Sequence, residues 1–457
     1  MPPKRRWNRM HTEKRPTTEM TAAAYDVATA ACGYPASTSA TIDDALDSAQ
    51  DPCHVGHSLG DDLAFFPVMS AVELAKISVP ASSPPAKLNA ILAEHGVCLV
   101  TEVLAPQECG HLEEFWQQDS LSLLDRQHGE RDLETAEVLE QLRRPEGLKA
   151  WPSQWGEALG KKGSASLRAA PHGQFAWAAR LQPAVKDVFA KLFAVTATDL
   201  AVGVDCTFWC PYDSPAAESN IEWLHCDQNH RTGLTWPCFQ GVLYVWPSEG
   251  EHASTTVIWP GSHREVYKRL MQDKFAIKQG FKKGGQSVHL SRLLDPNTRE
   301  ELTAAAIANS RRVPCPAGSL LLWDSRTIHQ GWAGGPRLAQ PICWEPKARR
   351  ERAPDAAAIL RRKIFMCAAG VPSSHSSCEG RVHGLAPRQV PTILQKRGLP
   401  PMKPQLRPHS IADSQVKSWL ALWESLWAGD GDPRKNADLA NEAALAKLLR
   451  SEVLAAL

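Results

Sequence analysis

The chain has 457 residues, of which 43% are hydrophobic and 22% are charged, and this composition is ordinary for a globular protein. The 51 Lys and Arg residues nearly balance the 50 Asp and Glu residues, so the net charge of +1 gives no reason to expect nucleic acid or an anionic membrane as a partner. No run of about 18 apolar residues occurs, so we expect no membrane span.

The cysteines and the first residues bear on the compartment. The twelve cysteines form no Cys-x-x-Cys pair, and Cys206 and Cys210 are interpreted as small buried hydrophobic residues. The basic start Met1-Pro-Pro-Lys-Arg-Arg6 is not followed by the apolar core of a signal peptide. We interpret it as a solvated tail, with a nuclear address as the alternative. We therefore expect a reducing, cytoplasmic compartment.

Residues 1–86 are expected to form a weakly ordered N-terminal extension, because Ala, Ser, Thr and Pro dominate there and prolines close the segment. Order is expected from residue 87 onward. Leu88–Gly96 has the apolar spacing of a helix that ends at a glycine, and Val97–Val100 follows as a buried strand. Pro106 stands at the favoured first turn of a further helix.

Residues 87–350 are expected to form the main domain, mainly β with flanking helices (an α+β arrangement). Residues 119–166 predict a charged helical cover, and 175–193 predict one helix with a core-facing apolar stripe. From there to Pro346, short apolar runs alternate with turn residues, which predicts an antiparallel barrel or jelly roll. Residues 351–457 predict a helical C-terminal extension that packs on the core. Its helices are predicted at 355–366, 414–427 and 436–457.

Three residues are candidate ligands of one metal ion. His225 and Asp227 have period-two spacing, so on an extended chain both side chains face the same way. His329 is the preferred third ligand because it ends the apolar strand that starts at Leu320. Two imidazoles and one carboxylate suit Fe(II) and leave three adjacent coordination positions open. A His-x-Asp pair also arises by chance, so the residues leave open a capped surface histidine with Asp227 as a turn former.

Arg337 is the candidate anion-binding residue. It lies eight positions after His329, across the turn-like segment Gly331–Pro336, and is predicted to start the strand beside the one that carries His329. A guanidinium at that position can bind a carboxylate through two parallel hydrogen bonds. The alternative is an arginine on an exposed strand edge.

From about Leu88 to His375 the sequence resembles the phytanoyl-CoA dioxygenase-like branch of the Fe(II)/2-oxoglutarate oxygenases. The matching pieces are Gly96-Val-Cys-Leu-Val100 with Leu104-Ala-Pro106, Trp223-Leu-His-Cys-Asp-Gln228, Gln240-Gly-Val-Leu243, Pro260-Gly-Ser-His263, Trp323-Asp-Ser-Arg-Thr-Ile-His329, Gly335-Pro-Arg337 and Ser373-Ser-His375. One departure is His252–Thr256, which stands where family members often carry a Gly-Gly-Leu-like turn.

The resemblance implies a double-stranded β-helix core (jelly roll, cupin-like). It implies that His225, Asp227 and His329 bind Fe(II) and that Arg337 binds the distal carboxylate of 2-oxoglutarate. It also makes Gln240 a cosubstrate or substrate contact. Because halogenating relatives replace the carboxylate ligand with a small residue, Asp227 favours hydroxylation with O2 of a small or lipid-like organic substrate, with release of succinate and CO2.

Other residues near these motifs have blander interpretations. Pro260–His263 is interpreted as a turn in which Ser262 and His263 make structural hydrogen bonds. Trp223 and Gln228–His230 border the metal candidates and are expected either to touch substrate or to support the ligands. The alternatives to an oxygenase are a catalytically silent jelly-roll binding or scaffold protein and a hydrolase with zinc at the same three ligands.

Overall fold

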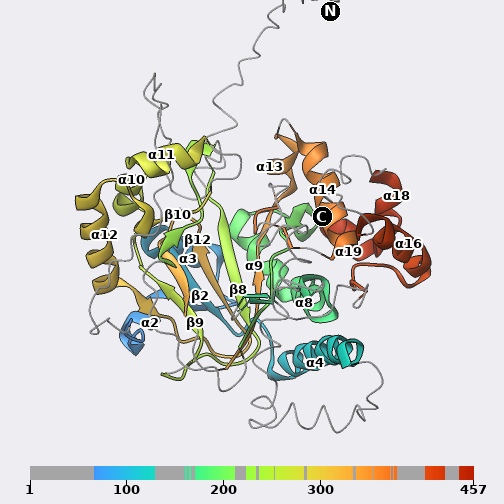
Figure 1. Cartoon of the computed structure of the whole chain (residues 1–457). Coiled ribbons are helices and arrows are strands. Elements are labelled where there is room, and N and C mark those ends of the chain that lie inside the picture. The colour runs from blue at the N-terminus through green and yellow to red at the C-terminus, as the bar shows by residue number, and fades with distance from the viewer. Residues whose placement is uncertain are drawn as a thin grey trace, which may run out of the picture. The chain divides into compact units, whose positions relative to one another are not determined.

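A computed structural model describes the chain. Figure 1 shows the chain. The structure describes residues 66–128, 160–161, 164–165, 170–210, 223–232, 236–251, 253–281, 286–332, 336–353, 355–370, 372–373, 375–377, 407–427 and 442–457. The predictions for residues 1–65, for most of the charged cover and for the first part of the helix predicted over 436–457 lie outside these ranges.

A six-stranded sheet forms one wall of the core. Its strands, in spatial order, are β1 (Ser78–Pro80), β2 (Val97–Thr101), β12 (Ser319–Asp324), β8 (Phe239–Tyr244), β14 (Arg337–Ile342) and β6 (Phe208–Cys210). β1 and β2 pair in parallel, whereas the other neighbours are antiparallel. Every residue of β12 and β8 is buried. Both faces of this sheet are therefore covered, which explains why its central strands are almost continuously apolar.

A five-stranded antiparallel sheet forms the facing wall. Its strands are β10 (Val288–His289), β7 (His225–Cys226), β13 (His329–Trp332), β9 (Thr255–Ile258) and β11 (Arg311–Arg312). One buried cluster joins Tyr244, Leu321 and Trp323 of the larger sheet to Ile258 of the smaller one. Because side chains alternate along a strand, these residues mark the faces that point between the sheets.

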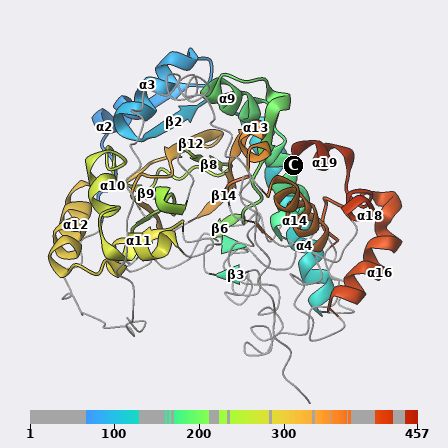
Figure 2. The ribbon, with the colours of Figure 1, turned by 90° about the horizontal axis from the view of Figure 1, so that it is seen from above.

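Helices cover the outer faces of both sheets (Figures 1 and 2). The smaller sheet packs against α10 (Glu265–Leu270), α11 (Lys274–Gly280) and α12 (Pro296–Asn309). The larger sheet packs against α3 (Pro85–His95), α4 (Pro106–His128), α8 (Gln174–Arg180), α9 (Pro183–Phe193) and the C-terminal helices. In the described part of the chain, every helix is too short or too polar to cross a lipid bilayer.

The helix and strand predicted just after residue 87 are confirmed. Helix α3 ends at Gly96, whose φ of 68° is the left-handed conformation that favours glycine, and β2 follows at Val97. The fold nevertheless begins earlier than predicted. Ser70 and Glu73 cap α2 (Ala71–Ile77) reciprocally, and β1 then joins the larger sheet. These segments are too short to show periodicity in the sequence.

The single helix predicted over residues 175–193 is wrong, because two helices occupy that stretch. Helix α8 ends at Arg180 and α9 begins at Pro183. Proline has no backbone N–H to donate and its ring clashes with the preceding turn, so it starts a helix instead of continuing one. The apolar stripe is still real, since Val188, Phe189 and Leu192 are buried in the core.

Strands do not simply alternate with turns up to Pro346, because α10–α12 interrupt the series. Asp273 accepts a hydrogen bond from the N–H of Phe275 at the start of α11. Asp295 accepts one from the N–H of Thr298 at the start of α12, directly before Pro296. Both are side-chain caps of a kind that a sequence can reveal. The short apolar runs on either side of these helices instead indicated strands throughout this region.

The C-terminal helices pack on the larger sheet. They are α13 (Lys347–Glu351), α14 (Ala356–Ala369), α16 (Val416–Trp427), α18 (Glu442–Ala446) and α19 (Ser451–Ala456). The one helix predicted over 436–457 is wrong within the described residues. Between α18 and α19, Leu449 forms a β-bridge with Ile411, and the N–H of Arg450 donates to the carbonyl of Ser410. This tertiary pairing replaces helical hydrogen bonds.

Two separate two-stranded antiparallel sheets are also present: β5 (Leu200–Val202) with β15 (Trp344–Pro346), and β3 (Gly160–Lys161) with β4 (Ser164–Ala165). The segment after β5 holds the stretch around His375. The N–H of Ser373 donates to the carbonyl of Val204, and the N–H of Val204 donates to the Ser373 hydroxyl at 3.0 Å. A side chain at Gly203 would place its Cβ 1.6 Å from the carbonyl oxygen of His375.

We therefore expect Gly203→Ala to lower the free energy of unfolding by about 1–3 kcal/mol, because backbone atoms cannot move aside cheaply. Gly250→Ala is the matched control, since nothing lies within 4 Å of a Cβ built there. Urea unfolding of the two variants and the parent chain measures the difference. Equal midpoints for all three proteins would show that residues 203 and 375 do not pack as described.

Candidate metal and anion site

The three candidate metal ligands converge where β7 and β13 pair. His225 lies directly opposite His329 in this pairing, and Asp227 follows β7. The Nε2 atom of His225 is 3.4 Å from Asp227 Oδ1, and the Nε2 atom of His329 is 3.3 Å from Asp227 Oδ2. One donor atom from each of the three residues lies within 4.8 Å of the others. His329 starts β13 and does not end the preceding apolar strand, as the sequence had suggested, because a turn follows Asp324.

Both imidazoles are oriented by backbone carbonyls. The Nδ1 atom of His225 faces the carbonyl of Trp223 at 2.5 Å, and the Nδ1 atom of His329 faces the carbonyl of Thr327 at 3.0 Å. A carbonyl only accepts hydrogen bonds, so each Nδ1 carries the proton. Each Nε2 then faces the Asp227 carboxylate, and it would offer its lone pair to a metal ion bound at the shared point.

Asp227 is held from both sides. The Ser287 hydroxyl donates to Oδ1 at 2.7 Å, and the Gln240 amide donates to Oδ2 at 3.2 Å. The same Gln240 amide also reaches the Ser325 hydroxyl at 3.1 Å, and the N–H of Asp227 donates to the Ser325 carbonyl. The Gln240 side chain therefore contacts a candidate metal ligand. Sequence reasoning missed Ser287, because a lone serine sixty positions from Asp227 has no local signal.

The electrostatics favour an ionised carboxylate. Burial alone would raise the pKa of Asp227, but the charges and hydrogen bonds of His225 and His329 outweigh it and hold that pKa well below its ordinary value. Burial and the nearby His225 lower the pKa of His329. Burial acts in the same direction on His225, but Asp227 reverses it and raises the pKa of that imidazole. The set is therefore a carboxylate between two imidazoles, which is a donor set for a divalent metal ion.

Arg337 also begins a strand, but not the predicted one. It starts β14 in the larger sheet, between β8 and β6, and not beside β13 in the smaller sheet. Trp332 of β13 and Arg337 of β14 thus belong to different walls. The Arg337 side chain is 4% exposed, and its Nη2 atom donates to the Tyr244 hydroxyl at 3.0 Å and to the Thr256 hydroxyl at 3.4 Å. Its guanidinium lies 4.4 Å from the ring centre of Phe208.

Arg337 is a buried cation that lacks an anionic partner among the described residues. Its Nε atom has no hydrogen-bond partner there, and its hydrogen bonds go to neutral hydroxyls. Thr256 lies two positions along β9 from Ile258, the residue opposite His329. Two strand positions span roughly 7 Å. An unpaired buried charge is costly, so this arrangement suits an anionic ligand that reaches from Arg337 toward the imidazoles.

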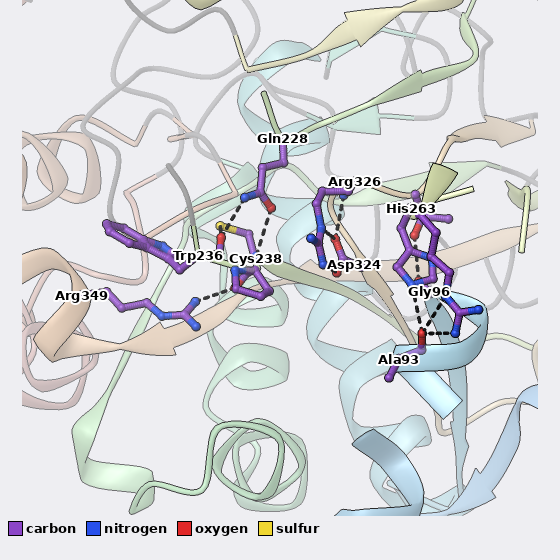
Figure 3. A network of polar contacts seen from close by, with 12 residues as sticks. Ala93, Gly96, Gln228, Trp236, Cys238, His263, Asp324, Arg326 and Arg349 are labelled. Atoms are coloured by element: carbon purple, nitrogen blue, oxygen red, sulfur yellow. Dashed lines mark hydrogen bonds and ion pairs between the residues drawn. The ribbon is translucent and has the colours of Figure 1, made fainter. Parts of the chain in front are cut away.

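The turn Pro260–His263 makes structural hydrogen bonds, as expected. The Ser262 hydroxyl donates to the carbonyl of Trp259 and accepts from the N–H of Ile328 at 2.8 Å. Figure 3 shows His263 against the carbonyl of Ala93, at 3.3 Å from Nε2. These contacts fix the start of β13 and with it the direction of His329.

Gln228 supports the segment that leads into β8 (Figure 3). Its amide donates to the carbonyl of Trp236 at 2.7 Å, and its side-chain oxygen accepts from the N–H of Cys238 at 3.2 Å. Asn229 likewise donates to the carbonyl of Ala276. Both side chains therefore tie the backbone around the site together.

No family model matches the chain. It is 28% identical over 184 residues to Ava biosynthesis cluster protein O of Aspergillus versicolor, a match that covers 38% of this chain. The chain spans 56% of the length of that relative.

Solved structures with partial likeness include three examples. A hypothetical protein from Escherichia coli has 10% identity and a TM-score of 0.40, over 67% of this chain and 81% of that one. EctD from S. alaskensis, solved with 2-oxoglutarate and 5-hydroxyectoine, has 14% identity and a TM-score of 0.34, over 64% of this chain and 86% of that one. The epimerase SnoN, solved with Fe3+, alpha ketoglutarate and nogalamycin RO, has 13% identity and a TM-score of 0.32, over 57% of this chain and 84% of that one.

We expect Ser287→Ala and Gln240→Leu each to weaken divalent metal binding by roughly 10- to 100-fold, because each removes a hydrogen bond that fixes a ligand carboxylate. Titration with Co(II), followed by its visible absorbance, measures the affinity. Ser82→Ala, at an exposed position, is the control and should bind Co(II) like the parent chain. Unchanged affinity in both site variants would mean that Asp227 does not depend on these contacts.

Proposed function

We propose that this protein is an Fe(II)- and 2-oxoglutarate-dependent dioxygenase of the phytanoyl-CoA dioxygenase-like type, with a double-stranded β-helix core. In this proposal it hydroxylates a small or lipid-like organic substrate and releases succinate and CO2. The observation that carries the proposal is the convergence of two imidazole Nε2 atoms and one carboxylate at the smaller sheet, opposite a buried arginine of the larger sheet that has no anionic partner among the described residues.

The donor set fits Fe(II). His225, Asp227 and His329 would hold the ion through two imidazole nitrogens and one carboxylate oxygen, a donor set that suits Fe(II) and would leave coordination positions for other ligands. The hydrogen bonds from Ser287 and Gln240 engage both oxygens of Asp227. They would keep the carboxylate directed at the ion as other ligands arrive.

The buried arginine fits a dicarboxylate cosubstrate. One end of 2-oxoglutarate would lie at the metal ligands and the distal carboxylate at Arg337, whose Nε atom lacks a hydrogen-bond partner among the described residues. The hydroxyls of Tyr244 and Thr256 hold the guanidinium in place and can donate to the same carboxylate. Charge-assisted hydrogen bonds of this kind are about twice as strong as neutral ones.

Bound Fe(II) and 2-oxoglutarate would supply the chemistry that couples O2 to the oxidation of a substrate C–H bond. The residues of the chain bind, orient and exclude water. Trp323 and Tyr244 fill the space between the sheets, at 5% and 0% exposure, and keep bulk water away from the interior side of the site. The carboxylate of Asp227 would take the place at the metal that a halide needs in halogenating enzymes, which favours hydroxylation.

We expect the parent chain with added Fe(II) to form succinate from 2-oxoglutarate in an oxygen-dependent manner, and Asp227→Ala to abolish it by removing the anionic ligand. Liquid chromatography with mass detection measures succinate with and without O2. Equal background in both proteins would favour the alternative of a silent jelly-roll binding or scaffold protein. Activity with Zn(II) and no need for O2 would instead favour a hydrolase.

We expect Arg337→Gln to raise the KM for 2-oxoglutarate by about 10- to 100-fold, the size of one lost charged hydrogen-bond pair. Arg337→Lys should recover little, because lysine cannot form the two parallel bonds. Steady-state succinate formation gives the KM values. Arg269→Gln removes an exposed guanidinium paired with Glu301 and should leave KM unchanged. A normal KM in Arg337→Gln would remove this residue from the cosubstrate site.

A further inference from the structure

An exposed aromatic corner borders the metal ligands. Trp223 is 47% exposed and is one of five large hydrophobic side chains that are exposed in the described residues. Its ring centre lies 5.9 Å from that of His289, with an interplanar angle of 69°. It lies 6.4 Å from the ring of His225, at 71°. Trp223 and His289 thus form an aromatic corner beside His225, and the indole is its exposed side.

The sheet itself builds this corner. His289 on β10 lies directly opposite His225 on β7, and the two rings stack at 5.0 Å with an angle of 22°. The N–H of Leu290 donates to the carbonyl of Leu224, which extends the same pairing toward Trp223. The corner is therefore set by backbone hydrogen bonds between neighbouring strands.

Core packing does not account for Trp223. Its neighbours Leu224 and Cys226 are fully buried in the cluster under α10–α12. With alternating side chains, Trp223 shares the opposite face with His225 and Asp227. Other tryptophans, such as Trp177 and Trp344, are completely buried. A tryptophan half exposed on the ligand face is placed to contact a substrate, since an indole left in water loses the stabilisation of apolar burial.

We infer that Trp223 and His289 form a subsite for a planar aromatic ring of the substrate. The inference rests on the proposed function, which makes this face the substrate side of the metal. Aromatic rings prefer offset or edge-to-face contacts with centres about 4.5–7 Å apart. A flat ring in the corner can stack on one partner and meet the other by its edge, whereas a saturated ring of the same skeleton gains only apolar contact.

The test compares two probes with one carbon skeleton, 2-naphthol and decahydro-2-naphthol, on the full chain loaded with Zn(II). Ligand-observed NMR titration measures both dissociation constants. We expect 2-naphthol to bind roughly three- to tenfold more tightly, the contribution of one aromatic contact. Trp223→Leu should remove this preference, and Trp223→Phe should keep part of it.

Phe281→Leu is the matched control, because Phe281 is an exposed aromatic residue at 69% that belongs to no part of the proposed site. It should keep the preference for 2-naphthol. Equal affinities of the two probes for the parent chain, or a preference that survives Trp223→Leu, would overturn the inference. A preference lost equally in Phe281→Leu would do so as well.

Succinate formation by the Fe(II)-loaded parent chain tests the proposed oxygenase separately from the aromatic subsite. Succinate without an aromatic preference would leave the oxygenase in place and remove only the aromatic subsite. An aromatic preference without succinate would retain the subsite and remove the oxygenase. The Zn(II) measurement involves no turnover, so each result can be read independently of the other.

Discussion

The direct pairing of β7 with β13 is the constraint on which the site depends. Opposite residues of an antiparallel pair hold their side chains about 5 Å apart, and the rings of His225 and His329 are 4.5 Å apart between centres. Asp227 then needs only the period of an extended chain to reach both imidazoles. A slip of one residue in this register would turn one histidine to the other face of the sheet, and the three donor atoms would no longer lie together.

The second element comes from the opposite wall. Arg337 lies on the larger sheet, yet its guanidinium donates to Thr256 of the smaller one. The apolar cluster between the sheets, which includes Leu321 and Ile258, keeps both walls in place. A buried cation beside neutral hydroxyls is unfavourable without an anion. The proposed cosubstrate would thus pair with a guanidinium that has no anionic partner in the described part of the chain, and its binding would be coupled to the distance between the walls.

The surroundings of Asp227 tie distant parts of the chain to the metal face. Ser287 precedes β10, Gln240 belongs to β8, and Ser325 follows β12. Ser287 and Gln240 donate to the carboxylate from the two sheets, and Ser325 accepts from Gln240 and from the N–H of Asp227. Strand β10 also carries His289 of the aromatic corner. The same strands therefore position the metal ligands, their supports and the inferred substrate contact, so rigidity of the sheets translates into precision at the site.

The sequence by itself determined the local features. The glycine stop at Gly96 and the continuous apolar run of β12 follow from residue preferences that act over a few positions. The period-two spacing of His225 and Asp227 likewise placed them on one face. Tertiary structure decided which wall carries Arg337, where His329 stands in its strand, and that Pro183 separates two helices. It alone brought Ser287 to Asp227 and Trp223 to His289. Such contacts depend on strand register and sheet order, which arise from packing between segments far apart in the chain and leave no local pattern.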